Sequence, residues 1–241
     1  MIKINPDSLL ELLKKAQVKN LKDNGYYGSS FAIGGFEISM EKTAELYAML
    51  ANKGVLKKLR FNKFDASGGE NIISPEAAFL TLMMLKDNKR PENEIKAAED
   101  FCGFDVYWKT GTSYAFRDAW TAGVFGNYVL VVWIGKFDNE GRRTFMARTC
   151  AAPLFFEIIK SLSAKIKDIK NYAPASHGLN VSKTEVCSVS GDLPSRYCKY
   201  TSETYFISGK FPIKICDVHR PVYIDKKTGL RASTKIGRAS C

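Results

Sequence analysis

Val106-Tyr107-Trp108-Lys109-Thr110-Gly111-Thr112-Ser113 marks the point at which the helical spacing of the upstream sequence gives way to an extended pattern. Residues 119–124 and 128–135 follow, and Gly126-Asn127 joins them. All three segments are rich in aromatic and β-branched residues, which favour strands, and a short polar turn is typical of a hairpin. The sequence therefore predicts three antiparallel strands.

Helical patterns flank these strands on both sides along the chain. Apolar residues recur at helical spacing in residues 7–18, 39–53 and 149–163. Ser74-Pro75-Glu76 begins a further helix with a capping hydroxyl, a proline at the first helical position and a carboxylate near the positive end of the dipole. Residues 87–104 are polar, and we expect a surface connection there. Helices packed on a sheet meander give an α+β or layered α/β fold.

Three parts are predicted along the chain: a main domain at residues 1–167, a linker at residues 168–183, and a small β-rich module at residues 184–241.

With 45% apolar and 25% charged residues, the composition is that of a folded protein and not of a disordered one. No apolar run approaches the roughly 20 residues that span a bilayer, and residues 1–6 lack the order of a signal peptide.

The 241-residue chain carries a formal net charge of +11, which favours contact with a polyanion. Nucleic acid, an anionic membrane face and an acidic cell-wall polymer all have the required charge. We expect no nucleic-acid partner, because the basic residues are scattered and form no arginine-rich helix or aromatic-basic pair of strands.

Lys109-Thr110-Gly111-Thr112 is the motif with the clearest chemistry. A lysine sets a positive potential, and threonine hydroxyls can bind a substrate carboxylate. Glycine lets a peptide lie against the strand, and the amide after it can point at the oxygen of a tetrahedral intermediate. A second triplet, Lys227-Thr228-Gly229, lies in a polar turn, where we expect a structural role.

This motif and its surroundings resemble the active-site strand of class A penicillin-binding proteins. The resemblance rests on residues 109–120, on Val132-Trp133-Ile134-Gly135, and on the upstream segments 32–39 and 46–54. Cys187-Ser188-Val189-Ser190-Gly191 and Cys216-Asp217-Val218-His219-Arg220 resemble the C-terminal module of the penicillin-binding protein 1C type. The resemblance extends from about residue 7 to the end of the chain.

The resemblance implies the C-terminal part of a penicillin-binding transpeptidase (serine β-lactamase-like) fold with a small β-rich C-terminal module. The full-length relative would cross-link peptidoglycan stem peptides and react with β-lactams. Lys109, Thr110, Gly111, Thr112 and Ser113 would bind the substrate, and the Thr112 amide would form half of the oxyanion hole. The implied location is the periplasmic side of the bacterial inner membrane, among other cell-wall synthesis proteins, with no cofactor and no metal.

The family's nucleophilic serine signature is not found upstream of Gly34-Gly35, and no Ser-x-Asn occurs in the chain. One Ser-x-x-Lys exists, at Ser39–Lys42, but Ser39 aligns with a later helix of the family, and we interpret it as a helix N-cap. We therefore expect a fragment with no catalytic residue of its own beyond the Thr112 amide. The alternative is a non-catalytic module that binds the cell wall or another protein.

Cys187, Cys198, Cys216 and Cys241 are crowded into the last part of the chain. With His219, the first three could bind zinc, although Cys187 and Cys198 lie too far apart in sequence for the usual Cys-x2-Cys pair. The resemblance instead implies a location outside the cytoplasm, where disulfides persist. On that ground we expect two disulfides, Cys187 with Cys198 and Cys216 with Cys241. Cys102 and Cys150 are expected to be buried or half-buried thiols.

Overall fold

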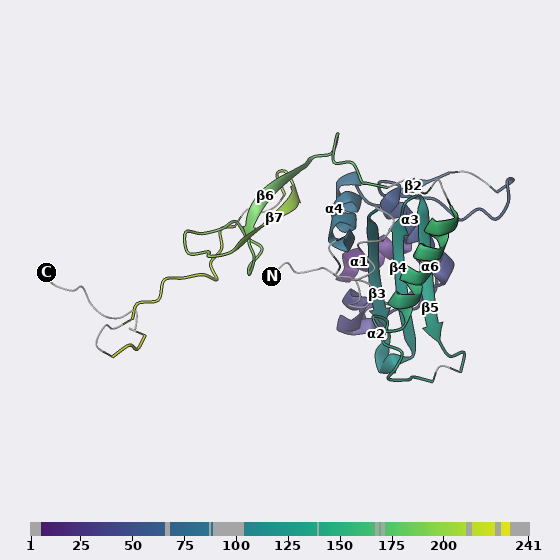
Figure 1. Ribbon diagram of the computed structural model, residues 1–241, viewed down its shortest axis with the longest axis horizontal. Helices are drawn as coiled ribbons and strands as arrows, with labels where there is room; N and C mark the ends of the chain where they lie inside the picture. Colours follow the sequence, from purple (N-terminus) through teal and green to yellow (C-terminus); the bar gives the residue numbers. More distant parts are fainter. Residues whose placement is uncertain are drawn as a thin grey trace. The chain divides into compact units, whose positions relative to one another are not determined.

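The structure, a computed structural model, describes residues 6–65, 68–86, 88, 104–138, 140–166, 169, 172–210, 214–224 and 228–231. The chain divides into two compact units, Met1–Leu179 and Asn180–Cys241 (Figure 1). The first unit holds the three predicted strands, and the second holds most of the cysteines.

A three-stranded antiparallel sheet forms the centre of the first unit. Its strands are β3 (Val106–Thr112), β4 (Asp118–Phe125) and β5 (Tyr128–Gly135), hydrogen-bonded in that order. The two-residue turn between β4 and β5 begins at Gly126, whose φ of 52° is left-handed, a conformation that glycine adopts without steric cost. The predicted strands and their antiparallel order are confirmed.

Helices cover both faces of this sheet, because successive strand side chains point to opposite sides. The helix α6 (Ala151–Lys165) packs on one face, where Trp108 stacks on Phe155 with ring centroids 6.4 Å apart. The helices α3 (Met40–Ala51) and α4 (Pro75–Lys86) pack on the other face, where Tyr107 is buried against Leu82 (Figure 1). The layered α/β arrangement predicted from helices packed on a sheet meander is confirmed.

Local hydrogen bonds account for where the helices begin. The Ser74 hydroxyl accepts a hydrogen bond from the Ala77 amide at 3.2 Å, which caps α4 ahead of Pro75. The helix α6 begins at Ala151, two residues later than predicted, because the Met146 carbonyl accepts from the amides of residues 149 and 150 in a preceding turn. Six further elements are found among the described residues of the first unit: α1 (Pro6–Lys15), α2 (Asn24–Tyr27), the 3₁₀ helices η1 (Gly28–Ile33) and η2 (Tyr114–Phe116), β1 (Val55–Leu56) and β2 (Glu70–Asn71). Among the helices of the described ranges, none combines the length and apolar character needed to cross a bilayer.

The second unit is built on one antiparallel hairpin, β6 (Val181–Cys187) paired with β7 (Thr201–Ile207). Its first strand begins inside the span expected to be a linker. Among the described residues of this unit, the only buried apolar side chains are Val186, Cys187 and Cys216. A hairpin with so little buried apolar surface is marginally stable by itself, so its stability must come from another source.

Thr121 on β4 is a buried polar residue that the sequence did not single out. Its side chain is 0% exposed, and within the part of the chain that the structure describes its hydroxyl has no hydrogen-bond partner. A buried hydroxyl without a partner costs about 1–3 kcal/mol of desolvation. Replacing it with valine, which keeps the shape, is therefore expected to raise the free energy of unfolding by about 1 kcal/mol. Urea denaturation checks this, and a lower stability would show that a water or an undescribed residue satisfies the hydroxyl.

Candidate functional site

The strand β3 is an edge strand, since within the described sheet it pairs only with β4. The carboxamide of Asn88 donates a hydrogen bond to the Trp108 carbonyl at 2.7 Å, so that carbonyl points away from β4. In an antiparallel pair the backbone groups alternate between the partner strand and the outside. The amides and carbonyls of Thr110 and Thr112 therefore point to the same free edge as Trp108. The contact made by Asn88 could not be found from the sequence, because the residue lies in the expected surface connection.

Polar side chains of the predicted motif lie along this edge. Lys109 is exposed, and its ammonium donates to the Thr110 carbonyl at 2.9 Å. The Thr112 hydroxyl accepts from the Ala147 amide at 3.1 Å, and the Ser113 hydroxyl accepts from the Asp118 amide at 2.8 Å. Each hydroxyl that accepts keeps its own hydrogen for donation to a ligand. The structure places Lys109–Thr112 at the end of β3 with Ser113 directly after it, and hydrogen bonds hold the Thr112 and Ser113 hydroxyls in place.

Gly111 leaves the exposed surface of β3 open. A Cβ atom at this position would meet only the Cβ of Trp120, at the ordinary contact distance of 3.8 Å. Packing within the described structure therefore does not require a glycine at this position. Gly123, which faces Trp108 across the strand pair, differs: a Cβ atom there would lie 2.8 Å from the Trp108 Cβ and 2.9 Å from Phe155.

These two glycines give a matched pair of alanine substitutions. Gly123→Ala should lower the free energy of unfolding by about 1–3 kcal/mol, because the core between β4 and α6 has no room for a methyl group. Gly111→Ala should change it by less than about 1 kcal/mol. Thermal unfolding of both variants provides the measurement. Equal destabilisation would mean that Gly111 is a packing residue and that its place in the motif has no connection with a ligand.

A strained turn follows the strand. Ala115 and Phe116 have φ values of 59° and 56°, in the left-handed region that non-glycine residues seldom occupy. The turn is fixed by Arg142, whose amide donates to the Phe116 carbonyl at 3.0 Å, and by Gly141, which lies against the Ala115 carbonyl. Strain of this kind persists only where the surroundings hold it, and it is concentrated at functional sites.

Ser39 occupies the position of an N-cap, as interpreted from the sequence. Its hydroxyl accepts from the Lys42 amide at 3.1 Å at the start of α3. The Lys42 ammonium forms an ion pair with Glu45 and donates to the Ala16 carbonyl at 3.3 Å, so no described contact directs it to the serine. A cavity of about 590 Å³ adjoins these residues, and its lining contains no residue of β3.

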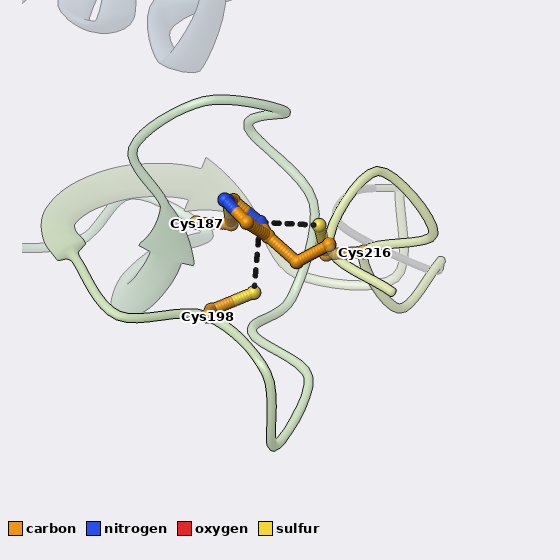
Figure 2. Close-up of side chains that lie close together, drawn as sticks. Cys187, Cys198 and Cys216 are labelled. Carbon is orange, nitrogen blue, oxygen red and sulfur yellow. Dashed lines mark hydrogen bonds between the residues drawn. The ribbon is translucent and has the colours of Figure 1, made fainter. Parts of the chain in front are cut away.

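A second group of predicted residues converges in the other unit. The Nδ1 atom of His219 lies 3.4, 3.5 and 3.4 Å from the sulfur atoms of Cys187, Cys198 and Cys216, respectively. Figure 2 shows the sulfur atoms of Cys198 and Cys216, each joined by a dashed line to a ring nitrogen that lies beside Cys187. All three are free thiols, so the structure does not hold the expected disulfide between Cys187 and Cys198. The expected partner of Cys216, Cys241, lies outside the described residues.

Hydrogen bonds favour the thiolate form of Cys187 and Cys216 in this cluster, whereas the pKa of the Cys198 thiol is raised. The Ser190 hydroxyl and the His219 amide donate to Cys216 and lower the pKa of its thiol to about 5. The amide of Ser190 is the main cause of a lowered pKa at Cys187. The contact with Cys216 raises the pKa of His219, because a nearby negative charge stabilises the protonated ring.

The remaining predicted residues lie apart from both groups. In the second Lys-Thr-Gly triplet, Gly229 has a φ of 67°, which places it in a turn, while Lys227 lies outside the described residues. Cys150 is half-buried and donates to the Met146 carbonyl at 3.1 Å, and burial raises the pKa of its thiol. Cys102 lies outside the described residues.

Two protein families match consecutive parts of the sequence. The family described as the penicillin-binding protein transpeptidase domain matches residues 4–166. The family described as the C-terminal domain of penicillin-binding protein 1A matches residues 179–221, which include all four residues of the cysteine and histidine cluster. The second match is to the 1A type and supports the expected 1C type only weakly.

Individual relatives agree with these matches. Penicillin-binding protein 1A of Clostridium tetani is 31% identical over 205 residues, which are 76% of this chain and 25% of the relative. Penicillin-binding protein 1C of Escherichia coli is 32% identical over 110 residues, which are 46% of this chain and 14% of the relative. Among solved structures, penicillin-binding protein 1A of Haemophilus influenzae superposes with a TM-score of 0.64 at 20% identity, over 88% of this chain and 38% of that one.

The chain spans about a quarter of the length of the first of these curated relatives. Its sheet with helices on both faces agrees with the fold of the solved relative, and its β3 motif lies inside the matched transpeptidase region. The chain belongs to the penicillin-binding protein transpeptidase family, and its relatives place it among the class A penicillin-binding proteins.

Proposed function

We propose that the free edge of β3 is the substrate-binding edge of a peptidoglycan D,D-transpeptidase. One observation carries the proposal: the exposed Lys109 lies beside a strand edge whose outward amides belong to Thr110 and Thr112. An extended peptide can add to such an edge as a further strand, and its terminal carboxylate then meets the lysine ammonium and the threonine hydroxyls. β-Lactams, which carry a carboxylate in the same relation to their reactive carbonyl, bind in the same way.

The Thr112 amide has the role of an oxyanion-hole donor in this proposal. It is two residues beyond Thr110 and has the same outward direction, so it can reach the carbonyl oxygen of a peptide aligned along the edge. Its position is fixed by the hydrogen bond from the Ala147 amide to its side chain. A donor held in place before the reaction stabilises the developing negative charge without reorganisation.

The family's nucleophilic serine signature is missing from this chain, because its one Ser-x-x-Lys, at Ser39–Lys42, caps the helix α3. The site acts at the periplasmic side of the bacterial inner membrane, as in class A relatives, and together with other cell-wall synthesis proteins. The formal net charge of the whole chain, +11, favours contact with the acidic polymers of that compartment.

Amide chemical shifts test whether β3 binds a carboxylate. Titration with an N-acylated D-alanyl-D-alanine peptide should shift the amide signals of Thr110 and Thr112, which point to the free edge, with smaller changes on β5. The matched control ligand is the same peptide with a C-terminal amide, which lacks the carboxylate and should give much weaker shifts. Equal shifts with both ligands, or shifts confined to other elements, would remove the support for a carboxylate-binding edge.

The chain by itself is expected to form no covalent adduct with a fluorescent β-lactam. The reason lies at Ser39, whose hydroxyl caps a helix while the ammonium of Lys42 is held by Glu45. A serine without a base to take its proton is a poor nucleophile. A denaturing gel provides the measurement, and a labelled band that disappears in Ser39→Ala would identify Ser39 as the nucleophile.

A further inference from the structure

Three sulfur atoms and one ring nitrogen lie close together in the second unit. The ligand atoms of Cys187, Cys198, Cys216 and His219 all lie within 4.8 Å of one another. Hydrogen bonding alone does not explain this arrangement. A neutral imidazole has at most one hydrogen on Nδ1, directed along the plane of the ring, and it cannot serve three sulfur atoms at 3.4–3.5 Å.

The distances agree with the ligand shell of a tetrahedral metal ion. With zinc bonds of about 2.3 Å to sulfur and about 2.0 Å to nitrogen, tetrahedral angles place the nitrogen about 3.5 Å from each sulfur and the sulfurs about 3.8 Å from one another. The observed nitrogen–sulfur distances are 3.4–3.5 Å. All four ligand atoms lie within 4.8 Å of one another, so no separation exceeds the tetrahedral sulfur–sulfur spacing by more than about 1 Å.

The backbone around the cluster brings these residues together from three separate segments. Cys187 ends β6, Cys198 lies in the connection to β7, and Cys216 and His219 follow β7. The amide of Cys216 donates to the Leu193 carbonyl at 2.8 Å, and the amide of Cys187 donates to the Asp192 carbonyl at 2.8 Å. The β6–β7 connection is therefore bound both to the end of β6 and to the segment after β7.

Backbone amides also point at the sulfur atoms. The Val189 amide donates to the Cys187 sulfur at 3.4 Å, and the Ser195 amide donates to the Cys198 sulfur at 3.3 Å. Such hydrogen bonds disperse the negative charge of thiolate ligands and fix their orientation, as the surroundings of metal ligands do. Disulfide sulfurs carry no charge that would need these donors.

The cluster also replaces a core that the unit lacks. Two of the three buried apolar side chains among its described residues, Cys187 and Cys216, are members of the cluster itself. A small unit with so few buried apolar side chains among its described residues gains stability from disulfides, a metal or a partner. Disulfides would give His219 no role in the cluster, whereas a four-coordinate metal uses all four of its members.

We propose that Cys187, Cys198, Cys216 and His219 bind one structural zinc ion that holds the C-terminal unit together. Three thiolates and one imidazole in a closed tetrahedral arrangement are the ligands of structural zinc sites. Softer sulfur ligands exclude magnesium and calcium, which take oxygen ligands. The site is closed, because all four positions are filled by side chains, and it therefore has a structural role and no catalytic one.

Metal analysis of the whole chain tests this site directly. The protein is reduced, exposed to zinc alone, freed of excess metal and measured for zinc content by mass spectrometry. We expect one zinc per chain in the wild type. In Cys216→Ser, which lacks one of the four ligands, the zinc content should be lower by at least about tenfold. Cys150→Ser is the matched control, because it removes a free thiol outside the cluster, and it should keep one zinc.

A second pair of variants keeps the test valid if Cys216→Ser fails to fold. His219→Cys replaces the imidazole with a fourth sulfur ligand and should retain one zinc, whereas His219→Ala removes the fourth ligand and should not. Cobalt in place of zinc should give the visible absorption of a tetrahedral sulfur-rich site in the wild type and in His219→Cys. Two findings would overturn the proposal: a wild type that binds no stoichiometric zinc, or intact protein in which Cys187, Cys198 and Cys216 resist alkylation until a disulfide is reduced.

Discussion

Replacing Lys109 with alanine is expected to slow acylation by a β-lactam about 30- to 1,000-fold in a complete transpeptidase site, the loss typical of removing one charge-stabilising group. The complete site is obtained by joining this chain to the upstream transpeptidase segment of a class A relative that carries the Ser-x-x-Lys and Ser-x-Asn signatures. Lys109 is the exposed cation at the free edge of β3, where the ligand carboxylate is proposed to lie. The second-order rate of acylation by a fluorescent penicillin is the quantity to measure.

Lys136→Ala provides the control for this experiment. Lys136 directly follows β5 and forms ion pairs with Asp138 and Glu140, so its removal also takes a positive charge from the same unit. Acylation should stay within about twofold of the unsubstituted protein, since exposed ion pairs contribute little. If Lys109→Ala and Lys136→Ala behave alike, Lys109 is a surface residue of the strand and the proposed carboxylate site is wrong.

The central sheet and its helices could be predicted from the sequence because the signals are local. Trp108 and Tyr107 alternate along β3, and each packs against a helix on its own face of the sheet. The caps at Ser39 and Ser74 involve residues three positions away, so a short window of sequence contains both partners. Local capping and strand periodicity were sufficient for these elements.

The contacts that orient the site could not be predicted, because their partners are distant in sequence. Asn88 reaches the Trp108 carbonyl from 20 residues away, and the Ala147 amide reaches the Thr112 hydroxyl from 35. The same reason explains the cysteine cluster. Cys187 and Cys198 lack the usual short spacing of a zinc pair, and only the folding of their connection onto the segment before Cys216 brings the thiols to His219. The location implied by the family resemblance favoured disulfides, and the long spacing argued against zinc, whereas the structure gathers three free thiols.

Removal of zinc is expected to unfold the C-terminal unit while the transpeptidase unit stays folded. Structural zinc sites contribute about 10–16 kcal/mol in small peptides, which exceeds what a hairpin with three buried apolar side chains can supply. The transpeptidase unit has its own aromatic core between the sheet and α6, and no residue of the cluster belongs to it. Amide hydrogen exchange separates the two responses, since it reports on β4 and on β6 in one sample.

After treatment with a zinc chelator, the amides of β6 and β7 should exchange at nearly the rate of an unfolded chain. An isolated hairpin without the metal is unfolded most of the time. The amides of β4 and β5 serve as the internal control and should keep their protection. Addition of zinc should restore the protection of β6 and β7, and addition of magnesium should not, because the cluster offers sulfur and nitrogen ligands that magnesium does not prefer. Protection of β6 and β7 that persists in zinc-free protein would show that the hairpin is stable by itself, and the cluster would then have no part in holding this unit together.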